Sequence, residues 1–209
     1  LIDIYKKVSV HLKVKKAFVT SGIRHDLLTG KNAEENKNNH YDEYTEQLVK
    51  HHVSGRLKIA PEHTSDQVLK VMRKPSFKFF HAFKKNFDRI CKKAGLKQQL
   101  IPYFISSHPG SQVEDMANLA CETKDLGFQL EQVQDFTPTP MTVATVIYYS
   151  GYHPYTLKRM YTARTPNEKR DQHRFFFWYK KENRDWIYNT LKRANKIELV
   201  DKLLGKSRK

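Results

Sequence analysis

Polar and ionisable side chains follow four segments of the chain that have the composition of buried β-strands. They are Ser21, Arg24, His25 and Asp26 after the first segment, Glu62 and His63 after the second, Ser106, Ser107 and His108 after the third, and Asp135 after the fourth. In parallel α/β sheets, function gathers at the carboxyl ends of the strands, so we expect these groups along one rim. Arginine can bind a carboxylate through two hydrogen bonds, and glutamate can accept from a ribose diol. The pattern predicts a ligand site at that rim.

Each of these residues also has a purely structural interpretation. Arg24 could pair with Glu62 or with Asp26, and on spacing alone an ion pair explains it as well as a ligand does. His63 and His108 belong to a metal-binding residue type, but no cysteine or carboxylate stands at ligand spacing from them, so no metal site is predicted. The sequence also lacks the glycine-rich dinucleotide, phosphate-loop, His-Glu-x-x-His and Gly-x-Ser-x-Gly motifs, which excludes the classes that depend on them.

The segments between these residues alternate between strand and helix patterns. Strands are predicted at 16–20, 55–60, 100–107 and 128–136, and helices at 2–12, 41–52, 64–72 and 75–95 and after residue 111. Thr64 with Gln67, and Ser111 with Glu114, have the spacing of capping boxes. Such alternation predicts an α/β domain with a parallel sheet.

The composition favours a folded cytoplasmic protein. Hydrophobic residues make up 39% of the 209 positions, which is enough for a core. Cys91 and Cys121 are too few for a disulfide scaffold or a four-thiolate metal site, and we expect reduced core thiols. No apolar run approaches the roughly 20 residues that cross a bilayer, so no membrane contact is expected. The opening residues from Leu1 read as the interior of a domain, which predicts a fragment of a longer protein.

The C-terminal segment is strongly basic. Residues 151–209 hold 16 Lys and Arg against 6 Asp and Glu, a net charge of +10 out of +16 for the chain. Charge of this density favours polyanions such as RNA, although a solvated surface explains it too. The aromatic run 175–179 could stack bases, but packing inside the fold is the favoured interpretation. We expect residues 156–209 to form a basic helical extension.

Several motifs resemble radical S-adenosylmethionine (SAM) enzymes. The stretch SGIRHDLL at 21–28 looks like their fourth strand, GRLKIAPEHTSDQVLKVM at 55–72 like their fifth, and LIPYFISSHPG at 100–110 like their sixth. Together with QVQDFTPTP at 132–140, these stretches are similar to the YgiQ-type group of uncharacterised radical SAM proteins. The similarity extends over about residues 1–165.

The resemblance implies a (β/α)6 partial TIM barrel, of which residues 1–155 would be the C-terminal half. It also implies SAM and a [4Fe–4S] cluster as cofactors of the full-length protein, with the cluster on a Cys-x3-Cys-x2-Cys loop in a missing N-terminal half. SAM cleavage would give a 5′-deoxyadenosyl radical. Arg24 would meet the SAM carboxylate, Ser21 and Glu62 the ribose or amino group, and Ser106, Ser107 and His108 the adenine or substrate. Ser111 stands where related methylthiotransferases often carry Glu, so that activity is not implied.

This fragment alone should bind no cofactor and be inactive, since a cluster needs three thiolates. An alternative is a noncatalytic RNA-binding module that uses the basic extension, and a purely structural role is a third interpretation. A half barrel also exposes sheet edges, which predicts a homodimer of the fragment.

Overall fold

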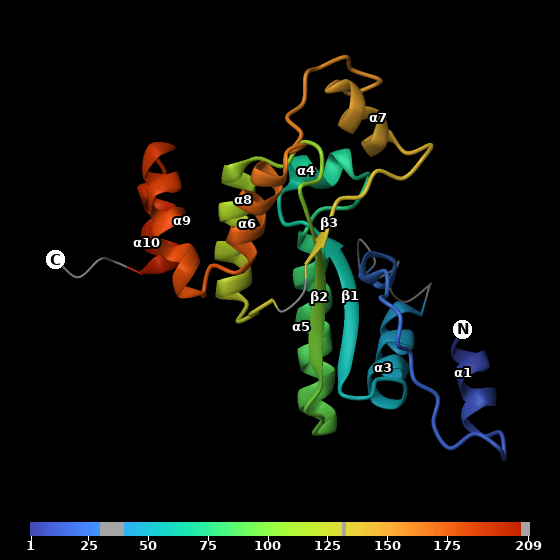
Figure 1. The fold of residues 1–209 in the computed structure, drawn as a ribbon. Coiled ribbons are helices and arrows are strands. Elements are labelled where there is room, and N and C mark those ends of the chain that lie inside the picture. The colour runs from blue at the N-terminus through green and yellow to red at the C-terminus, as the bar shows by residue number, and fades with distance from the viewer. Residues whose placement is uncertain (30–39, 131–132, 206–209) are drawn as a thin grey trace. The chain divides into compact units, whose positions relative to one another are not determined.

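The computed structural model describes residues 1–29, 40–130 and 133–205, and it has a mixed α/β architecture (Figure 1). The elements in chain order are α1 (Ile2–Ser9), the 3-10 helix η1 (His25–Leu28), α3 (Tyr41–His51), β1 (Arg56–Glu62), α4 (Asp66–Val71), α5 (Lys78–Ala94), β2 (Gln99–Ser106), α6 (Val113–Asp125), β3 (Gln134–Asp135), α7 (Val143–Ser150), α8 (Pro166–Phe176), α9 (Lys181–Arg193) and α10 (Ile197–Leu204). The chain forms two compact units. The first unit is Leu1–Pro61 with Phe77–Tyr103, and the second is Glu62–Ser76 with Phe104–Lys209.

The strands form a small sheet in the order β1-β2-β3. β2 and β3 run parallel, with Ile105 opposite Gln134 and Ser106 opposite Asp135. Buried and exposed residues alternate along β2, as a strand with two different faces requires. The predicted α/β class with parallel strands is therefore confirmed.

Two strand predictions need correction. Residues 16–20 form no strand in the described chain, and their backbone joins the first unit through the N–H of Val19, which donates to the carbonyl of His52 at 2.9 Å. A single parallel bridge between Ile23 and Ile59 follows. Of the strand predicted at 128–136, only Gln134–Asp135 pairs, and residues 131–132 lie outside the described part. A β-prone composition without a paired neighbour does not make a strand.

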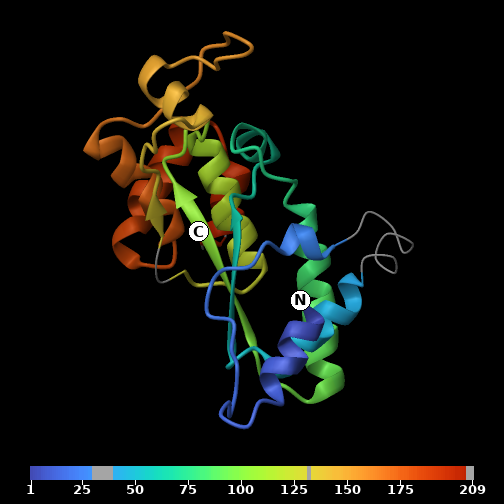
Figure 2. The same cartoon turned by 90° about the vertical axis from the view of Figure 1, so that its right-hand side faces the viewer.

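Helix α5 supplies much of the core of the first unit. Phe80, Phe83, Phe87 and Ile90 recur at helical spacing and are buried, as the sequence predicts. Gly95 follows in the left-handed region (φ 64°) and ends the helix where a side chain would be strained. Helix α3 packs against α5, and the two helices lie side by side in Figure 2.

The core of the second unit is mainly helical. Helix α6 packs against α8 and α10, and α10 against α9. Phe175 and Phe176 of the aromatic run are fully buried, and the ring of Phe176 lies 6.5 Å from that of Phe104. The packing interpretation of this run is confirmed for these two residues, and the charged helices predicted after residue 155 are present as α8, α9 and α10.

The helix starts differ from the predicted capping boxes. Helix α4 begins after Ser65 without a side-chain cap, and α6 begins after Gln112, whose N–H donates to the carboxylate of Asp115 at 3.0 Å. The Ser111 box is therefore displaced by one residue. Helix α7 occupies the apolar run at 143–149, whose structure the sequence pattern left open. None of the helices among the described residues is long and apolar enough to cross a membrane.

Candidate functional site

The six residues predicted to bind a cofactor fall in different units. Ser21 and Arg24 belong to the first unit, whereas Glu62, Ser106, Ser107 and His108 belong to the second. The two groups are therefore described separately.

In the first unit, Arg24 is engaged by a neighbouring carboxylate. Its Nε donates to Oδ1 of Asp26 at 2.8 Å, and its Nη2 donates to Oδ2. Burial alone would raise the pKa of Asp26, but the hydrogen bonds and charge of Arg24 outweigh it and hold that pKa below its usual value. The structural pairing with Asp26, one of the two alternatives from the sequence, is thus present. Ser21 is exposed.

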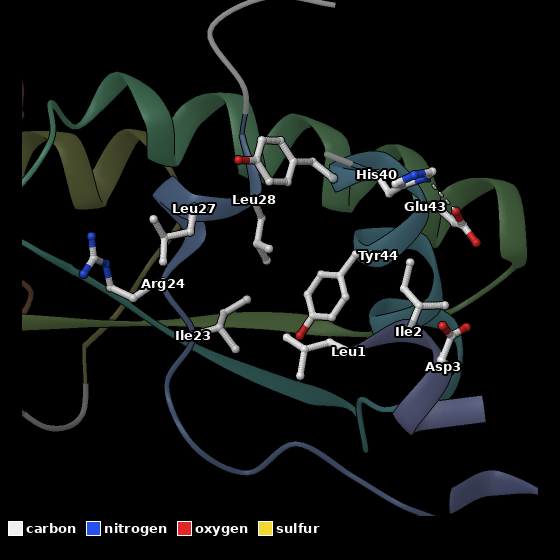
Figure 3. Close-up of a pocket in the computed structure, with 11 residues that line it drawn as sticks. Leu1, Ile2, Asp3, Ile23, Arg24, Leu27, Leu28, His40, Glu43 and Tyr44 are labelled. Atoms are coloured by element: carbon white, nitrogen blue, oxygen red, sulfur yellow. Dashed lines mark ion pairs between the residues drawn. The ribbon is translucent and has the colours of Figure 1, made fainter. Parts of the chain in front are cut away.

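Arg24 also borders a pocket of about 680 Å³ in this unit (Figure 3). Most of its lining is apolar, and the full set is Leu1, Ile2, Asp3, Ile23, Arg24, Leu27, Leu28, His40, Tyr41, Glu43 and Tyr44. In Figure 3, Arg24 lies at one end, and Asp3 and Glu43 lie at the other. His40 pairs with Glu43 at 3.3 Å, and the hydroxyl of Tyr44 lies 3.2 Å from that of Tyr5. The pocket suits an apolar or amphipathic group rather than proton transfer.

In the second unit, the backbone turns sharply at the ends of two strands. Glu62 closes β1 with φ 68°, and Ser107 directly follows β2 with φ 61°. Left-handed backbone at residues other than glycine costs free energy, and such strain clusters at ligand sites and switch regions. These two turns carry four of the six predicted residues.

A buried polar network holds the two turns together. Nδ1 of His63 accepts hydrogen bonds from the N–H groups of Thr64 (2.9 Å) and Ser65 (3.0 Å), so Nε2 carries the ring proton. Nε2 lies 3.3 Å from Oγ of Ser111, whose hydroxyl donates to Sδ of Met116 at 3.2 Å. His63 and Ser111 are fully buried. Both side chains are fixed by partners inside the protein.

Gln172 of α8 completes this network. Its Oε1 accepts from the N–H of Ser107 at 2.9 Å, and its Nε2 donates to the carbonyl of Ser111 at 2.8 Å. The hydroxyls of Ser106 and Ser107 lie 3.1 Å apart, and both residues are 0% exposed. A ligand can therefore reach these two serines only if the network opens.

His108 has one ring nitrogen left for other chemistry. Its Nδ1–H donates to the carbonyl of Pro109 at 2.9 Å, so the lone pair is on Nε2. Burial lowers the pKa of His108 to about 4. Burial, and next the charge of His108, lowers the pKa of His63 to about 3. Both rings are neutral at pH 7, and Nε2 of His108 can accept a hydrogen bond.

The acidic side chains at the ends of β1 and β3 each lie close to a basic side chain. Oε1 of Glu62 lies 3.2 Å from Nζ of Lys74, and Oδ1 of Asp135 lies 3.0 Å from Nε2 of His173. In the parts of the chain that the structure describes, no three His, Cys, Asp or Glu side chains are grouped to hold a metal ion.

The sequence interpretation missed Gln172 and His173. A usable signal was present, because Gln172 stands three and four residues before the buried Phe175 and Phe176 and so shares their helix face. A polar residue on a buried face must have hydrogen-bond partners, which points to a network.

These features define a mixed α/β chain with a buried polar network behind the carboxyl ends of its strands. The profile of one sequence family, described as "Domain of unknown function (DUF3362)", matches residues 131–208.

Longer proteins resemble the whole chain. A UPF0313 protein of Bacteroides thetaiotaomicron is 58% identical over 209 residues, which is 100% of this chain and 34% of the relative. A UPF0313 protein of Porphyromonas gingivalis is 55% identical over 207 residues (99% and 33%), and one of Methanosarcina acetivorans is 39% identical over 200 residues (96% and 26%). The chain spans about a third of the length of the first two relatives.

Proposed function

We propose that this chain is the C-terminal part of a radical SAM enzyme and supplies half of a partial (β/α)6 barrel. The observation that carries the proposal is the pair of left-handed turns at Glu62 and Ser107. Glu62 ends β1 and Ser107 follows β2, and both lie in sequence stretches similar to the strand ends of that family. Relatives about three times as long leave room for a cluster-binding part outside this chain.

The cysteines of this chain do not fit an iron–sulfur cluster. Cys91 lies in the first unit and Cys121 in the second, and both are buried. Burial raises the pKa of both thiols, whereas cluster iron binds thiolates and needs three of them from a radical SAM protein. The cluster is therefore assigned to the part of the longer protein outside this chain, and we assign no reaction step to Cys91 or Cys121.

The polar groups of the strand ends fit SAM better. Glu62 is partly exposed and pairs with Lys74 through Oε1, which leaves Oε2 to accept from a ribose hydroxyl. Nε2 of His108 can accept from an exocyclic amine. In this proposal Ser106 and Ser107 support the turn and touch no ligand.

The full-length protein provides the test. Its sequence should contain Cys-x3-Cys-x2-Cys upstream of this chain, and the anaerobically reconstituted protein should release 5′-deoxyadenosine from SAM under reducing conditions. Glu62→Gln should weaken SAM binding in equilibrium dialysis by roughly 10-fold, the loss of one charge-assisted hydrogen bond. Glu198→Gln, at an exposed position of α10, is the matched control. A full-length sequence without the three cysteines, or equal SAM affinities of the two variants, would contradict the proposal.

A further inference from the structure

Residues 136–167 of the second unit contain no aspartate or glutamate. The same stretch holds the cations Lys158, Arg159 and Arg164 and the tyrosines Tyr148, Tyr149, Tyr152, Tyr155 and Tyr161. Interleaved aromatic and basic residues are typical of surfaces that bind single-stranded nucleic acid. A surface that binds an acidic protein through its cations would not need the exposed tyrosine rings.

A tight hairpin presents these side chains. Tyr152 and Arg159 form an antiparallel bridge, and the N–H of His153 donates to the carbonyl of Lys158 at 2.9 Å. Nδ1 of His153 accepts from the N–H groups of Tyr155 and Thr156, both at 3.3 Å. The tip is therefore fixed by its own hydrogen bonds, so that little order has to be created on binding.

Rings at the end of α7 and on the hairpin are open to solvent. Tyr149 is 70% exposed and Tyr155 is 69% exposed. Arg73 lies just after α4, and its guanidinium is 5.3 Å from the centre of the Tyr155 ring. Leu157, at the tip, is 75% exposed and has φ 55°, an unfavourable backbone for an apolar branched side chain. An exposed apolar tip held in strained backbone points to a contact made by this hairpin.

A polar cavity of about 750 Å³ lies beside the rings. Its lining is Ser150, Gly151, Tyr152, Arg159, Met160, Tyr161, Thr162, Arg164 and Glu168. Arg164 donates to the carbonyl of Tyr149 at 3.0 Å, and Arg159 is exposed to solvent. The carboxylate of Glu168 caps α8, where it accepts from the N–H groups of Thr165 (2.8 Å) and Arg164 (3.0 Å). Two guanidinium groups are thus available to phosphates.

We propose that residues 149–164, which are the end of α7 and the hairpin segment after it, bind single-stranded nucleic acid together with Arg73. Bases stack on Tyr149, Tyr152 and Tyr155, and phosphates bind at Arg159 and Arg164. This goes beyond the proposed SAM chemistry and does not depend on it. Helices α8, α9 and α10 are a poorer platform, because Phe175 and Phe176 are buried and cations such as Lys196 and Lys202 pair with Glu114 and Asp125.

The proposal is tested by fluorescence anisotropy with labelled RNA and DNA single strands. A strand length of about 12 nucleotides lies within the range that such surfaces cover. Tyr155→Leu should weaken binding roughly 5- to 100-fold, because one base loses the ring on which it stacks. Tyr188→Leu is the matched control, because Tyr188 is also exposed and lies under a cation, Lys192, at 5.8 Å. Circular dichroism confirms that both variants are folded.

Charge is tested separately with Arg159→Gln and, as control on α9, Lys192→Gln. Arg159→Gln should reduce the slope of log affinity against log salt by roughly 0.7, the value for one phosphate contact with a single strand. Four results would overturn the proposal. They are no binding of either strand, equal losses in the Tyr155 and Tyr188 variants, equal slopes in the Arg159 and Lys192 variants, or equally tight binding of a duplex. A preference for RNA over DNA identifies the natural strand.

Discussion

Nε2 of His63 lies 3.3 Å from Oγ of Ser111, but the two residues do not form a base and nucleophile. Nδ1 of His63 accepts two backbone N–H groups, so the ring proton is on Nε2 and points at the serine. A general base would need its lone pair there. Ser111 accepts from the ring and donates to Met116, which makes the pair a structural link between the turns that follow β1 and β2.

The network leaves Glu62 and His108 as the polar groups of these turns with capacity for a ligand. His63 adjoins Glu62 in sequence, and Ser111 follows the Pro109-Gly110 turn after His108. Fixing His63 to Ser111 therefore fixes the backbone that carries both groups. Preorganised donors and acceptors cost no ordering free energy when a ligand binds.

We expect the chain to lose stability as the pH falls below about 6.5. The pKa values of His63 and His108 are lowered to about 3 and about 4, so the native state stays unprotonated where the unfolded chain binds protons. The free energy of unfolding should therefore be constant above the ordinary histidine pKa. Below it, stability should fall by roughly 1 kcal/mol per pH unit for each of the two histidines. Urea denaturation between about pH 7.5 and pH 5 measures this, above the range where carboxylates titrate.

His108→Asn separates the two contributions to this pH dependence. The asparagine amide can replace Nδ1–H as the donor to the Pro109 carbonyl but does not titrate, so the slope should fall to about half. A slope that is the same in wild type and His108→Asn would mean that His108 is not neutral in the native state.

Replacing Gln172 by leucine should destabilise the second unit. The change leaves the N–H of Ser107 and the carbonyl of Ser111 buried without their present partner. Each unsatisfied buried group costs about 1–3 kcal/mol, so the free energy of unfolding should fall by roughly 2–6 kcal/mol. Gln67→Leu, on the exposed side of α4, is the control and should change it by less than about 0.5 kcal/mol. Similar effects of both changes in urea denaturation would show that the network contributes little.

Local sequence patterns were enough to predict the elements whose partners are close in sequence or whose faces are strongly apolar. The aromatic stripe of α5, its end at Gly95 and the strand β2 all follow from spacing and composition. The pairing of Arg24 with Asp26 was one of two alternatives that spacing allowed. Such features depend on interactions within a few residues.

The errors have tertiary causes. Ser111 has the right spacing to cap α6, but its hydroxyl is used by His63 and Met116, so Gln112 takes the capping position. Residues 16–20 are β-prone, yet strand formation requires a neighbour that composition does not reveal. The burial of Ser106 and Ser107 likewise depends on Gln172, a residue far away in sequence.

The two thiols should be protected from modification in the folded chain. Cys91 and Cys121 are buried, and burial raises the pKa of each, so little thiolate is accessible. With Ellman's reagent near pH 8, we expect labelling at least roughly 100-fold slower than in urea, where both react. Anaerobic incubation of this chain with iron and sulfide should leave no bound cluster. Rapid native labelling, or visible absorption that co-elutes with the protein, would contradict the assignment of both residues to the core.

The backbone of Leu157 offers the last test, because it separates stability from binding. Asparagine tolerates the left-handed region better than leucine, and the exposed Leu157 side chain contributes little burial, so Leu157→Asn should raise the free energy of unfolding by up to about 1 kcal/mol. If Leu157 is retained for contact with a bound strand, the same variant should bind single-stranded nucleic acid more weakly than wild type. Urea denaturation and anisotropy on one preparation give both values. A variant that is both less stable and unchanged in binding would remove the argument that strain at this tip serves a contact.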